Sequence, residues 1–172
     1  MIKNISKTLS RLAAVQSCFQ SFFDDKSLKN LEKEFNEYRF KKKLDKNNLN
    51  LNYNKIFFND LILNIENFKA RYNVNKFFSD FINIKRPYER LDIITKAILI
   101  VWSSEILENS NIKKSIIINE YVEIAKSFLN KPEVSLINAI LDKVYESKEK
   151  NWWKYNYKWF FKKIKFFKKR NI

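Results

Sequence analysis

The chain has 172 residues, with 34 Lys and Arg against 19 Asp and Glu, which gives a net charge of +15. This length suits one domain with a sizeable core, or one domain followed by a tail. Because the sequence contains no glycine, it holds neither a phosphate-binding loop nor a dinucleotide-binding fingerprint. Because it contains no histidine and one cysteine, Cys18, it excludes His-dependent nucleophiles, an internal disulfide and the usual zinc sites, and we expect no cofactor.

The basic charge has two interpretations. Positive charge attracts polyanions such as nucleic acid or anionic lipid. Lys, Asn, Ile, Phe and Tyr also have A/T-rich codons, so a biased genome would raise their content without selection for binding. The longest apolar run, "AILIVW" at 97–102, is far shorter than the ~20 residues that span a bilayer. The first residues also lack the continuous apolar core of a signal peptide, so we expect a cytoplasmic protein without stable membrane insertion.

The first half of the chain predicts two helices and then a loop. Apolar residues at helical spacing predict a helix over 5–23, in which Lys7 and Arg11 share a second face. A second helix is predicted over about 26–40. The polar stretch 41–54 has few periodic apolar residues and predicts a loop. The apolar residues that share one face of the first helix, called its apolar stripe, are Ile5, Leu9, Leu12, Phe19 and Phe23.

Three further helices are predicted between 55 and 108. A break near 71–75 separates the first two, and Pro87 marks the boundary before the third. The third helix is apolar on most sides around "AILIVW", which predicts that it is the most buried one. In chain order the stripes are Phe58, Leu61, Ile65 and Phe68, then Phe77, Phe78, Phe81 and Ile82, then Leu91, Ile94, Ile98 and Val101.

Two more helices meet at a capped junction. Asn130 and Glu133 have the spacing of a capping box with Asn130 as the N-cap. Pro132 then falls in the first turn, where its missing N–H is harmless. The stripes on either side are Ile117, Tyr121, Ile124 and Phe128, and Val134, Ile137, Leu141 and Val144. Together these patterns predict an all-α fold.

The sequence from Glu146 onward has ten Lys or Arg and two Glu, interleaved with aromatic residues. Three interpretations of this tail stay open. It could stack on bases and neutralise phosphates, lie on an anionic membrane surface, or pack its aromatic face on the body as a helix or loosely ordered extension. We therefore predict a domain over 1–147 and a basic aromatic extension over 148–172. The residues that share its aromatic face are Trp153, Tyr157, Phe160, Ile164 and Phe167.

Two pairs of carboxylates are the remaining candidates for metal binding or acid–base chemistry. They are Asp24 with Asp25 and Glu120 with Glu123. Paired acids bind hard metals or act as acid and base, but on amphipathic helices they are usually solvated faces or caps. We therefore predict neither a metal site nor a catalytic site.

Four stretches resemble the NusB family of transcription antitermination factors. "SRLAAVQSCFQ" (10–20) is similar to the family's R-x-x-A-V-Q-A-L-Y-Q helix. "IINEYVEIAKSFLNKPEVSLINAILDKV" (117–144) is similar to V-I-N-E-A-I-E-L-A-K-x-F … F-V-N-G-V-L-D-K. Between them, "FFNDLILNI" (57–65) and "KAILIVWSSEIL" (96–107) are similar to F-x-x-x-L and K-A-V-L-R-x-A-x-Y-E-L. The resemblance covers about 5–147.

This resemblance implies about seven helices in two packed bundles, without catalysis. It also implies binding of boxA-like single-stranded RNA together with the ribosomal protein NusE. That assembly helps the transcribing RNA polymerase complex pass termination signals in ribosomal RNA operons. The alternative is a non-catalytic protein-interaction module of the same fold, including a homodimer, with weak or no RNA binding.

The resemblance assigns roles to nine positions. The RNA-binding set is Lys7, Arg11, Gln16, Ser135 and Leu136, and the structural set is Glu105, Asn119, Glu120 and Asn138. For Gln16 the alternative is an interior polar residue bonded to neighbouring backbone.

Several residues depart from the family pattern. Leu136 replaces an RNA-contacting aromatic residue, and Ser135 stands where a basic residue often occurs. Ile100 replaces the Arg of A-V-L-R, and the N-terminal arm has fewer arginines. These changes weaken the expected RNA affinity, which the Lys/aromatic tail could restore.

Overall fold

The computed structural model describes residues 2–24, 26–39, 53–82, 87–108 and 113–149. Within these ranges the chain forms seven α-helices, one π-helical turn and one 3-10 turn, without a β-strand. The elements are α1 (Ile2–Gln20), α2 (Leu28–Glu34), η1 (Phe35–Arg39), α3 (Lys55–Arg71), α4 (Val74–Ser79), η2 (Tyr88–Arg90), α5 (Ile93–Glu108), α6 (Lys114–Lys126) and α7 (Lys131–Glu149). The predicted all-α class is confirmed. Most of the predicted loop at 41–54, and the tail beyond 149, lie outside the described residues.

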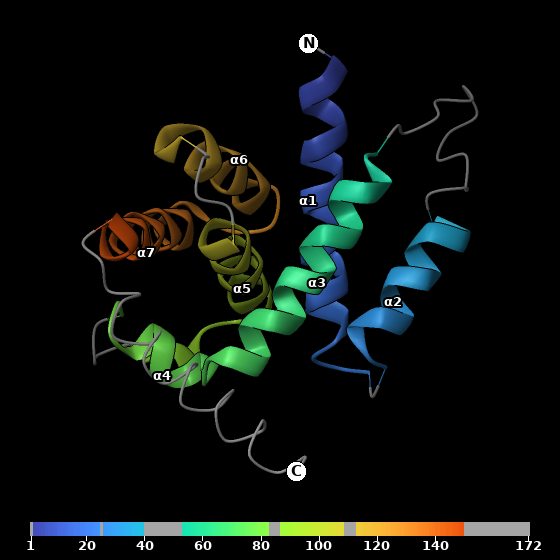
Figure 1. Ribbon diagram of the computed structural model, residues 1–172. Helices are drawn as coiled ribbons and strands as arrows, with labels where there is room; N and C mark the ends of the chain where they lie inside the picture. The colour runs from blue at the N-terminus through green and yellow to red at the C-terminus, as the bar shows by residue number, and fades with distance from the viewer. Residues whose placement is uncertain (1, 25, 40–52, 83–86, 109–112, 150–172) are drawn as a thin grey trace, which may run out of the picture.

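The helices form two bundles that share α5. Figure 1 shows α5 between α1 and α3 on one side and α6 and α7 on the other. α5 packs against all four of these helices, and α2 lies beside α1 and α3. Every residue from 97 to 106 is buried, because this helix is apolar on nearly all sides and is covered by neighbours from both bundles. The prediction that it is the most buried helix is confirmed.

Polar side chains cap the N-termini of several helices. The side chains of Ser27, Asn54 and Asn73 accept hydrogen bonds from the first turns of α2, α3 and α4. The predicted break between the two helices after 55 is confirmed at Tyr72 and Asn73. The capping box before α7 is confirmed as well. Its hydrogen bonds run from the Glu133 N–H to Asn130 Oδ1 (3.1 Å) and from the Asn130 N–H to Glu133 Oε2 (3.3 Å).

Five predicted stripe residues lie outside their helices, namely Phe23, Phe81, Ile82, Leu91 and Phe128. Leu91 follows the 3-10 turn that Pro87 begins, and α5 starts only at Ile93. Asp92 precedes α5, and its Oδ1 accepts from the Thr95 N–H at 2.8 Å, so Asp92 rather than Pro87 sets the boundary. Phe128 lies beyond the end of α6 and is 46% exposed, so it is not part of that helix's core stripe.

α1 packs on the core with small side chains. Val15 is fully buried beside them, and Leu12 and Phe19 are half-buried and pack against the core, whereas Ile5 is 59% exposed and Phe23, just past the helix end, is 63% exposed. Small residues allow the backbones of packed helices to approach closely, and α1 packs on both α3 and α5. The small buried residues are Ser10, Ala13, Ala14, Ser17 and Cys18.

Candidate functional site around α1

A buried arginine joins the two bundles. Arg11 on α1 is 6% exposed and reaches Glu105 on α5, which is fully buried. Its Nε donates to Glu105 Oε2 at 3.0 Å, and its Nη2 donates to Glu105 Oε1 at 2.8 Å. This two-point geometry matches the planar fork of the guanidinium to both carboxylate oxygens. The pair therefore fixes the position of α1 relative to α5.

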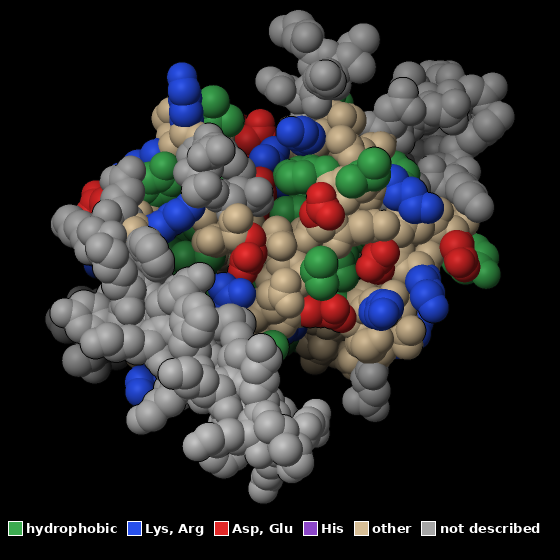
Figure 2. Space-filling model, viewed as in Figure 1, with side chains coloured by type: hydrophobic (Ala, Val, Ile, Leu, Met, Phe, Trp, Pro, Cys, Tyr) green, Lys and Arg blue, Asp and Glu red, His purple; other side chains and the backbone are tan. Residues whose placement is uncertain are grey.

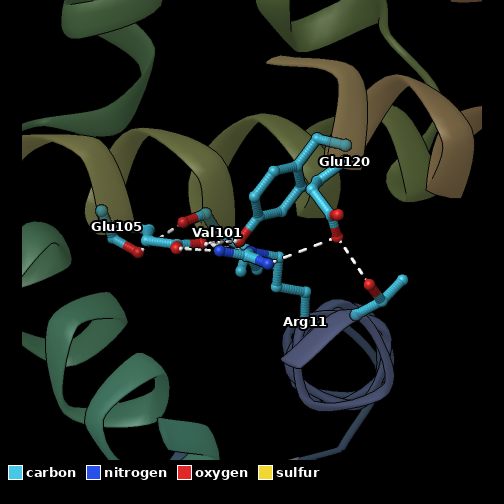
Figure 3. A network of polar contacts seen from close by, with 7 residues as sticks. Arg11, Val101, Glu105 and Glu120 are labelled. Atoms are coloured by element: carbon cyan, nitrogen blue, oxygen red, sulfur yellow. Dashed lines mark hydrogen bonds and ion pairs between the residues drawn. The ribbon is translucent and has the colours of Figure 1, made fainter. Parts of the chain in front are cut away.

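α6 completes the network from the other side. Arg11 Nη1 donates to Glu120 Oε2 at 3.3 Å, and the Thr8 hydroxyl donates to the same oxygen at 2.7 Å. The Tyr121 hydroxyl donates to Glu105 Oε2 at 2.6 Å. Figure 3 shows Glu120 accepting from α1 at two points, with the Arg11 side chain extending toward Glu105. Three helices are thus tied together through two carboxylates.

Burial and charge set the ionisation of this network. Burial by itself lowers the pKa of Arg11, but the hydrogen bond and negative charge of Glu105, with Tyr121 and Glu120, outweigh it and raise that pKa. Burial, together with the charge of Glu105, raises the pKa of Tyr121 well above its usual value of 10. Arg11 therefore stays charged, and Tyr121 stays a neutral donor.

Phe57 on α3 covers the outer side of the arginine. The Arg11 guanidinium lies 5.0 Å from the centre of the Phe57 ring, and Lys7 Nζ lies 5.3 Å from the same centre. Two cations on one helix thus share one aromatic ring. Lys7 is exposed, so its ammonium group is accessible to an anionic partner in a way that the buried Arg11 is not.

The other predicted RNA-binding residues lie apart from this network. Gln16 is exposed, which contradicts the alternative of an interior polar residue. It is nine residues from Lys7, which places the two on opposite sides of α1. Ser135 is exposed on α7 and its hydroxyl donates to the Lys131 carbonyl at 3.0 Å, while Leu136 is half-buried against the core.

The four predicted structural residues divide into two pairs. Glu105 and Glu120 belong to the network described above. Asn119 and Asn138 are exposed, and the Asn138 amide donates to Asp142 Oδ2 at 3.3 Å along α7. Of these four residues, only Glu105 and Glu120 therefore make polar contacts that join different helices.

An apolar cavity lies beside Gln16. It has a volume of about 520 Å³ and is formed by α1 and its last turn, η1, the start of α5 and the α6–α7 junction. Gln20 on its rim is held by two hydrogen bonds, since its amide donates to Asp24 Oδ2 and its oxygen accepts from Arg39. The cavity is lined by Gln16, Phe19, Gln20, Phe23, Arg39, Ile94 and Phe128.

The excess positive charge lies mainly outside the described part of the chain. The described residues contain 19 Lys and Arg and 17 Asp and Glu, so they are close to neutral. Figure 2 shows basic, acidic and hydrophobic side chains interspersed over the face that carries α3. The segment 150–172 alone has nine Lys or Arg and no acidic residue, and 41–43 is a run of three lysines.

Neither a metal-ligand cluster nor a membrane-spanning helix is found in the described residues. Within the described ranges, no group of three or more His, Cys, Asp or Glu could hold a metal ion. The same part of the chain contains no helix long and apolar enough to cross a membrane. The network around Arg11 positions α1, α5 and α6 relative to one another.

Sequence reasoning missed three members of the network, which are Thr8, Phe57 and Tyr121. Two signals could have found them. Glu105 is the lone charged residue within the long apolar stretch of its helix, which calls for buried donors around it. Tyr121 stands where the NusB pattern V-I-N-E-A has alanine, and this added hydroxyl is what reaches Glu105.

Comparison with known proteins agrees with this architecture. The model of the NusB family matches residues 8–146. The transcription antitermination protein NusB of Caulobacter vibrioides is 32% identical over 141 residues, covering 80% of this chain and 91% of the relative. The protein of the same name from Sinorhizobium medicae is 30% identical over 135 residues, covering 78% and 82%.

A solved structure gives the same fold. The chain matches NusB of T. maritima with a TM-score of 0.62 and 24% identity, over 81% of this chain and 89% of that one. The predicted arrangement of about seven helices in two packed bundles is thereby confirmed. From the family match and these relatives, we conclude that the chain belongs to the NusB family of non-catalytic transcription antitermination proteins.

Proposed function

We propose that this protein binds boxA-like single-stranded RNA together with the ribosomal protein NusE and so supports transcription of ribosomal RNA. The family match over residues 8–146 carries this proposal. The antitermination names of the relatives agree with it. RNA and NusE enter through the sequence resemblance of the α1 and α6–α7 stretches to the family.

Two kinds of group would hold the RNA. Single-stranded RNA needs cations for its phosphates and amides or flat side chains for its bases. The exposed Lys7 and Gln16 supply one of each on α1, and Ser135 adds an exposed hydroxyl on α7. Arg11 contributes indirectly, because its ion pairs with Glu105 and Glu120 position α1.

The segment 150–172 would supply most of the phosphate contacts. The described residues are nearly neutral, whereas this segment holds nine Lys or Arg among many aromatic residues. The aromatic residues of this segment would replace the base stacking that Leu136 cannot provide, because leucine lacks the flat ring of the family's aromatic residue. RNA affinity and its dependence on salt should therefore fall together when the segment is removed.

The test is fluorescence anisotropy of a labelled boxA-like RNA with the full chain, with and without NusE, over a range of salt concentrations. The truncation should follow Glu149, so that α7 and the bond from Lys148 to the Ile106 carbonyl are retained. We expect the truncation to weaken binding at least tenfold and to flatten the salt slope. Lys7→Ala should reduce that slope by about one, while the exposed control Lys29→Ala on α2 should not.

The second candidate function is an interaction module of the same fold with weak or no RNA binding. The near-neutral described residues, with Ser135 and Leu136 in place of a basic and an aromatic residue, favour this candidate. It would be supported, and the RNA proposal overturned, if the anisotropy of the labelled RNA did not rise on addition of the protein, either with or without NusE. If the anisotropy rose equally for the full and the truncated chain, RNA binding would stand but the role of 150–172 would be rejected.

A further inference from the structure

The outward side of α3 carries a row of residues that the packed helices leave exposed. We call it the α3 outer row. Its members recur at intervals of four, three, four and three residues, so they share one face of the helix. All five are exposed, and its two large apolar side chains are exposed by 78% (Ile56) and 54% (Leu63). The α3 outer row consists of Ile56, Asp60, Leu63, Asn67 and Ala70.

The core of the protein uses the other sides of α3. On one flank of the outer row, Asn59 accepts a hydrogen bond from Asn36 of η1 at 3.0 Å. On the other flank, Arg71 forms an ion pair with Glu108 of α5 at 3.0 Å. Figure 1 shows α3 between α2 and α5 and in front of α1. The row therefore points away from the described helices that pack on α3, and the core does not account for its isoleucine and leucine.

Three carboxylates border the outer row without an ion pair to any described residue. Asp60 belongs to the row, Glu66 lies on its flank toward α2, and Glu32 of α2 is close enough to Glu66 for their charges to interact. Burial, and then the negative charge of Glu66, raise the pKa of Glu32, and each of three nearby lysines has a smaller opposing effect. Figure 2 shows hydrophobic and acidic side chains exposed together on the face that carries α3, among basic ones. An occupant of this surface should therefore be both apolar and cationic.

Contacts at the end of α7 place the start of the segment 150–172 at one end of the outer row. Lys148 donates a hydrogen bond to the carbonyl of Ile106 on α5. Two residues further along α5, Glu108 binds Arg71, which directly follows Ala70 of the outer row. The last turns of α7, α5 and α3 are thus linked side by side, and the chain leaves α7 beside the last turn of α3.

The segment 150–172 is long enough to follow the row. Its 23 residues would span about 34 Å as a helix, and the row from Ala70 to Ile56 covers about 21 Å. The remaining length, about 13 Å, is available to connect α7 with the row. A segment joined to its own site also needs only a weak contact, because the tether gives an effective concentration in the millimolar range.

The segment matches the outer row in pattern and in charge. Its aromatic face recurs at the same intervals of four, three, four and three residues. The segment carries nine Lys or Arg and no acidic residue, which complements the three carboxylates. The five residues of the aromatic face, in order, are Trp153, Tyr157, Phe160, Ile164 and Phe167.

We propose that the segment 150–172 docks along the α3 outer row of its own chain and runs antiparallel to α3. The aromatic face covers Ile56 and Leu63, and lysines beside that face approach the three carboxylates. The lysines of the opposite face stay in solvent and form a basic row on a body that is close to neutral. The docking does not depend on the proposed RNA binding, and its tests contain no RNA.

The first test measures how fast a thiol in the outer row reacts with an aromatic disulfide reagent in the full chain. Leu63→Cys should react at least fivefold faster when Phe160→Asp is added, because the new charge detaches the aromatic face from α3. The matched control is Phe166→Asp, which makes the same change on the opposite face and should alter the rate less than twofold. The native Cys18 is fully buried, so its thiol should react slowly in every variant. Equal rates in the two double variants would overturn the proposal.

A thiol elsewhere distinguishes this docking from a place in the apolar cavity. Phe128 lines that cavity, lies before the start of α7, far from its last residue, and is 46% exposed. The rate of Phe128→Cys should change less than twofold when Phe160→Asp is added. If Phe128→Cys became faster and Leu63→Cys did not, the segment would occupy the cavity, and docking on α3 would be refuted.

The second test fixes the direction of packing by disulfide formation. Leu63 is the middle member of the outer row and Phe160 is the middle member of the aromatic face, so antiparallel docking brings them together. Under oxidation, Leu63→Cys with Phe160→Cys should form an internal bond at least tenfold faster than Phe128→Cys with Phe160→Cys. Equal rates would refute the docking. Covalent dimers in place of internal bonds would assign the outer row to the segment of another molecule and refute docking within one chain.

Discussion

Replacing Arg11 by methionine isolates the contribution of the network that joins the two bundles. The substitution keeps a long side chain beside Phe57 but removes the three guanidinium hydrogen bonds to Glu105 and Glu120. Glu105 then remains fully buried with the Tyr121 hydroxyl as a donor and without its counter-charge. The main cost comes from stranding this carboxylate, because the Glu120 side chain is partly exposed and can be solvated.

The expected loss is about 3–5 kcal/mol of unfolding free energy, which is typical when one partner of a buried ion pair is removed. Tyr121→Phe removes a single hydrogen bond to a charged group and should cost about 1.5–3 kcal/mol. Glu120→Gln, at the partly exposed edge, should cost less than about 1 kcal/mol. The order of these three losses follows from the number of hydrogen bonds removed and from the burial of the carboxylate that accepts them, so measuring the order checks the structure.

Urea unfolding followed by far-UV circular dichroism measures these differences, with an unchanged m-value showing that the unfolded state is unaffected. The double variant Arg11→Met with Glu105→Met is the decisive control. It buries no unpaired charge, so it should recover most of the stability lost in Arg11→Met. A loss below about 1 kcal/mol in Arg11→Met, or no recovery in the double variant, would refute the assignment of Glu105 as a stranded charge.

Three further changes test other parts of the fold. Asn130→Ala breaks the capping box before α7 and should cost about 0.5–2 kcal/mol in urea unfolding, while Asn130→Gly costs only a few tenths. Ser103→Ala should raise the melting temperature, because its buried hydroxyl has no hydrogen-bond partner among the described residues. Ser104→Ala should lower it, because that hydroxyl donates to the Val101 carbonyl at 2.8 Å. Burial raises the pKa of Cys18 from 9 to about 11 and that of Tyr121 well above 10. As the pH rises, the unfolded chain therefore loses these protons before the folded chain does, and the free energy of unfolding should fall above pH 9. Cys18→Ala should remove the part of this loss between pH 9 and 11, and an unchanged pH profile in that variant would contradict the argument.

Local signals were sufficient for the boundary before α7. The spacing of Asn130 and Glu133 predicted a cap that the structure contains, because a capping box is decided by residues three apart. Pro87 was less informative. It begins a 3-10 turn, and the start of α5 is set by Asp92, whose side chain binds the backbone of Thr95. A proline restricts the chain at its own position but does not specify which helical turn follows.

The network around Arg11 shows what sequence spacing leaves undetermined. The i, i+4 spacing of Lys7 and Arg11 is compatible with a common solvent-facing pair. The structure separates them, since Lys7 is exposed and Arg11 is buried against Glu105, nearly a hundred positions further along the chain. A long-range partner of this kind is set by how α1 crosses α5, and helix crossing depends on side-chain size at the contact rather than on the charge pattern.

α1 also shows that hydrophobic periodicity identifies a face without saying what covers it. The stripe from Ile5 to Phe23 has perfect helical spacing, and the usual inference would turn it toward the core. The structure buries Ala13, Ala14 and Cys18, whose small side chains let α1 approach α5 closely enough for Arg11 to reach Glu105. Leu12 and Phe19 of the stripe pack at the edge of the core, and Ile5 and Phe23 at its two ends stay exposed. The ion pair and the exposed ends of the stripe therefore both follow from the way α1 packs on α5. A substitution that enlarged Ala14 would push α1 away from α5 and lengthen the contacts of Arg11, so the free energy of unfolding should fall.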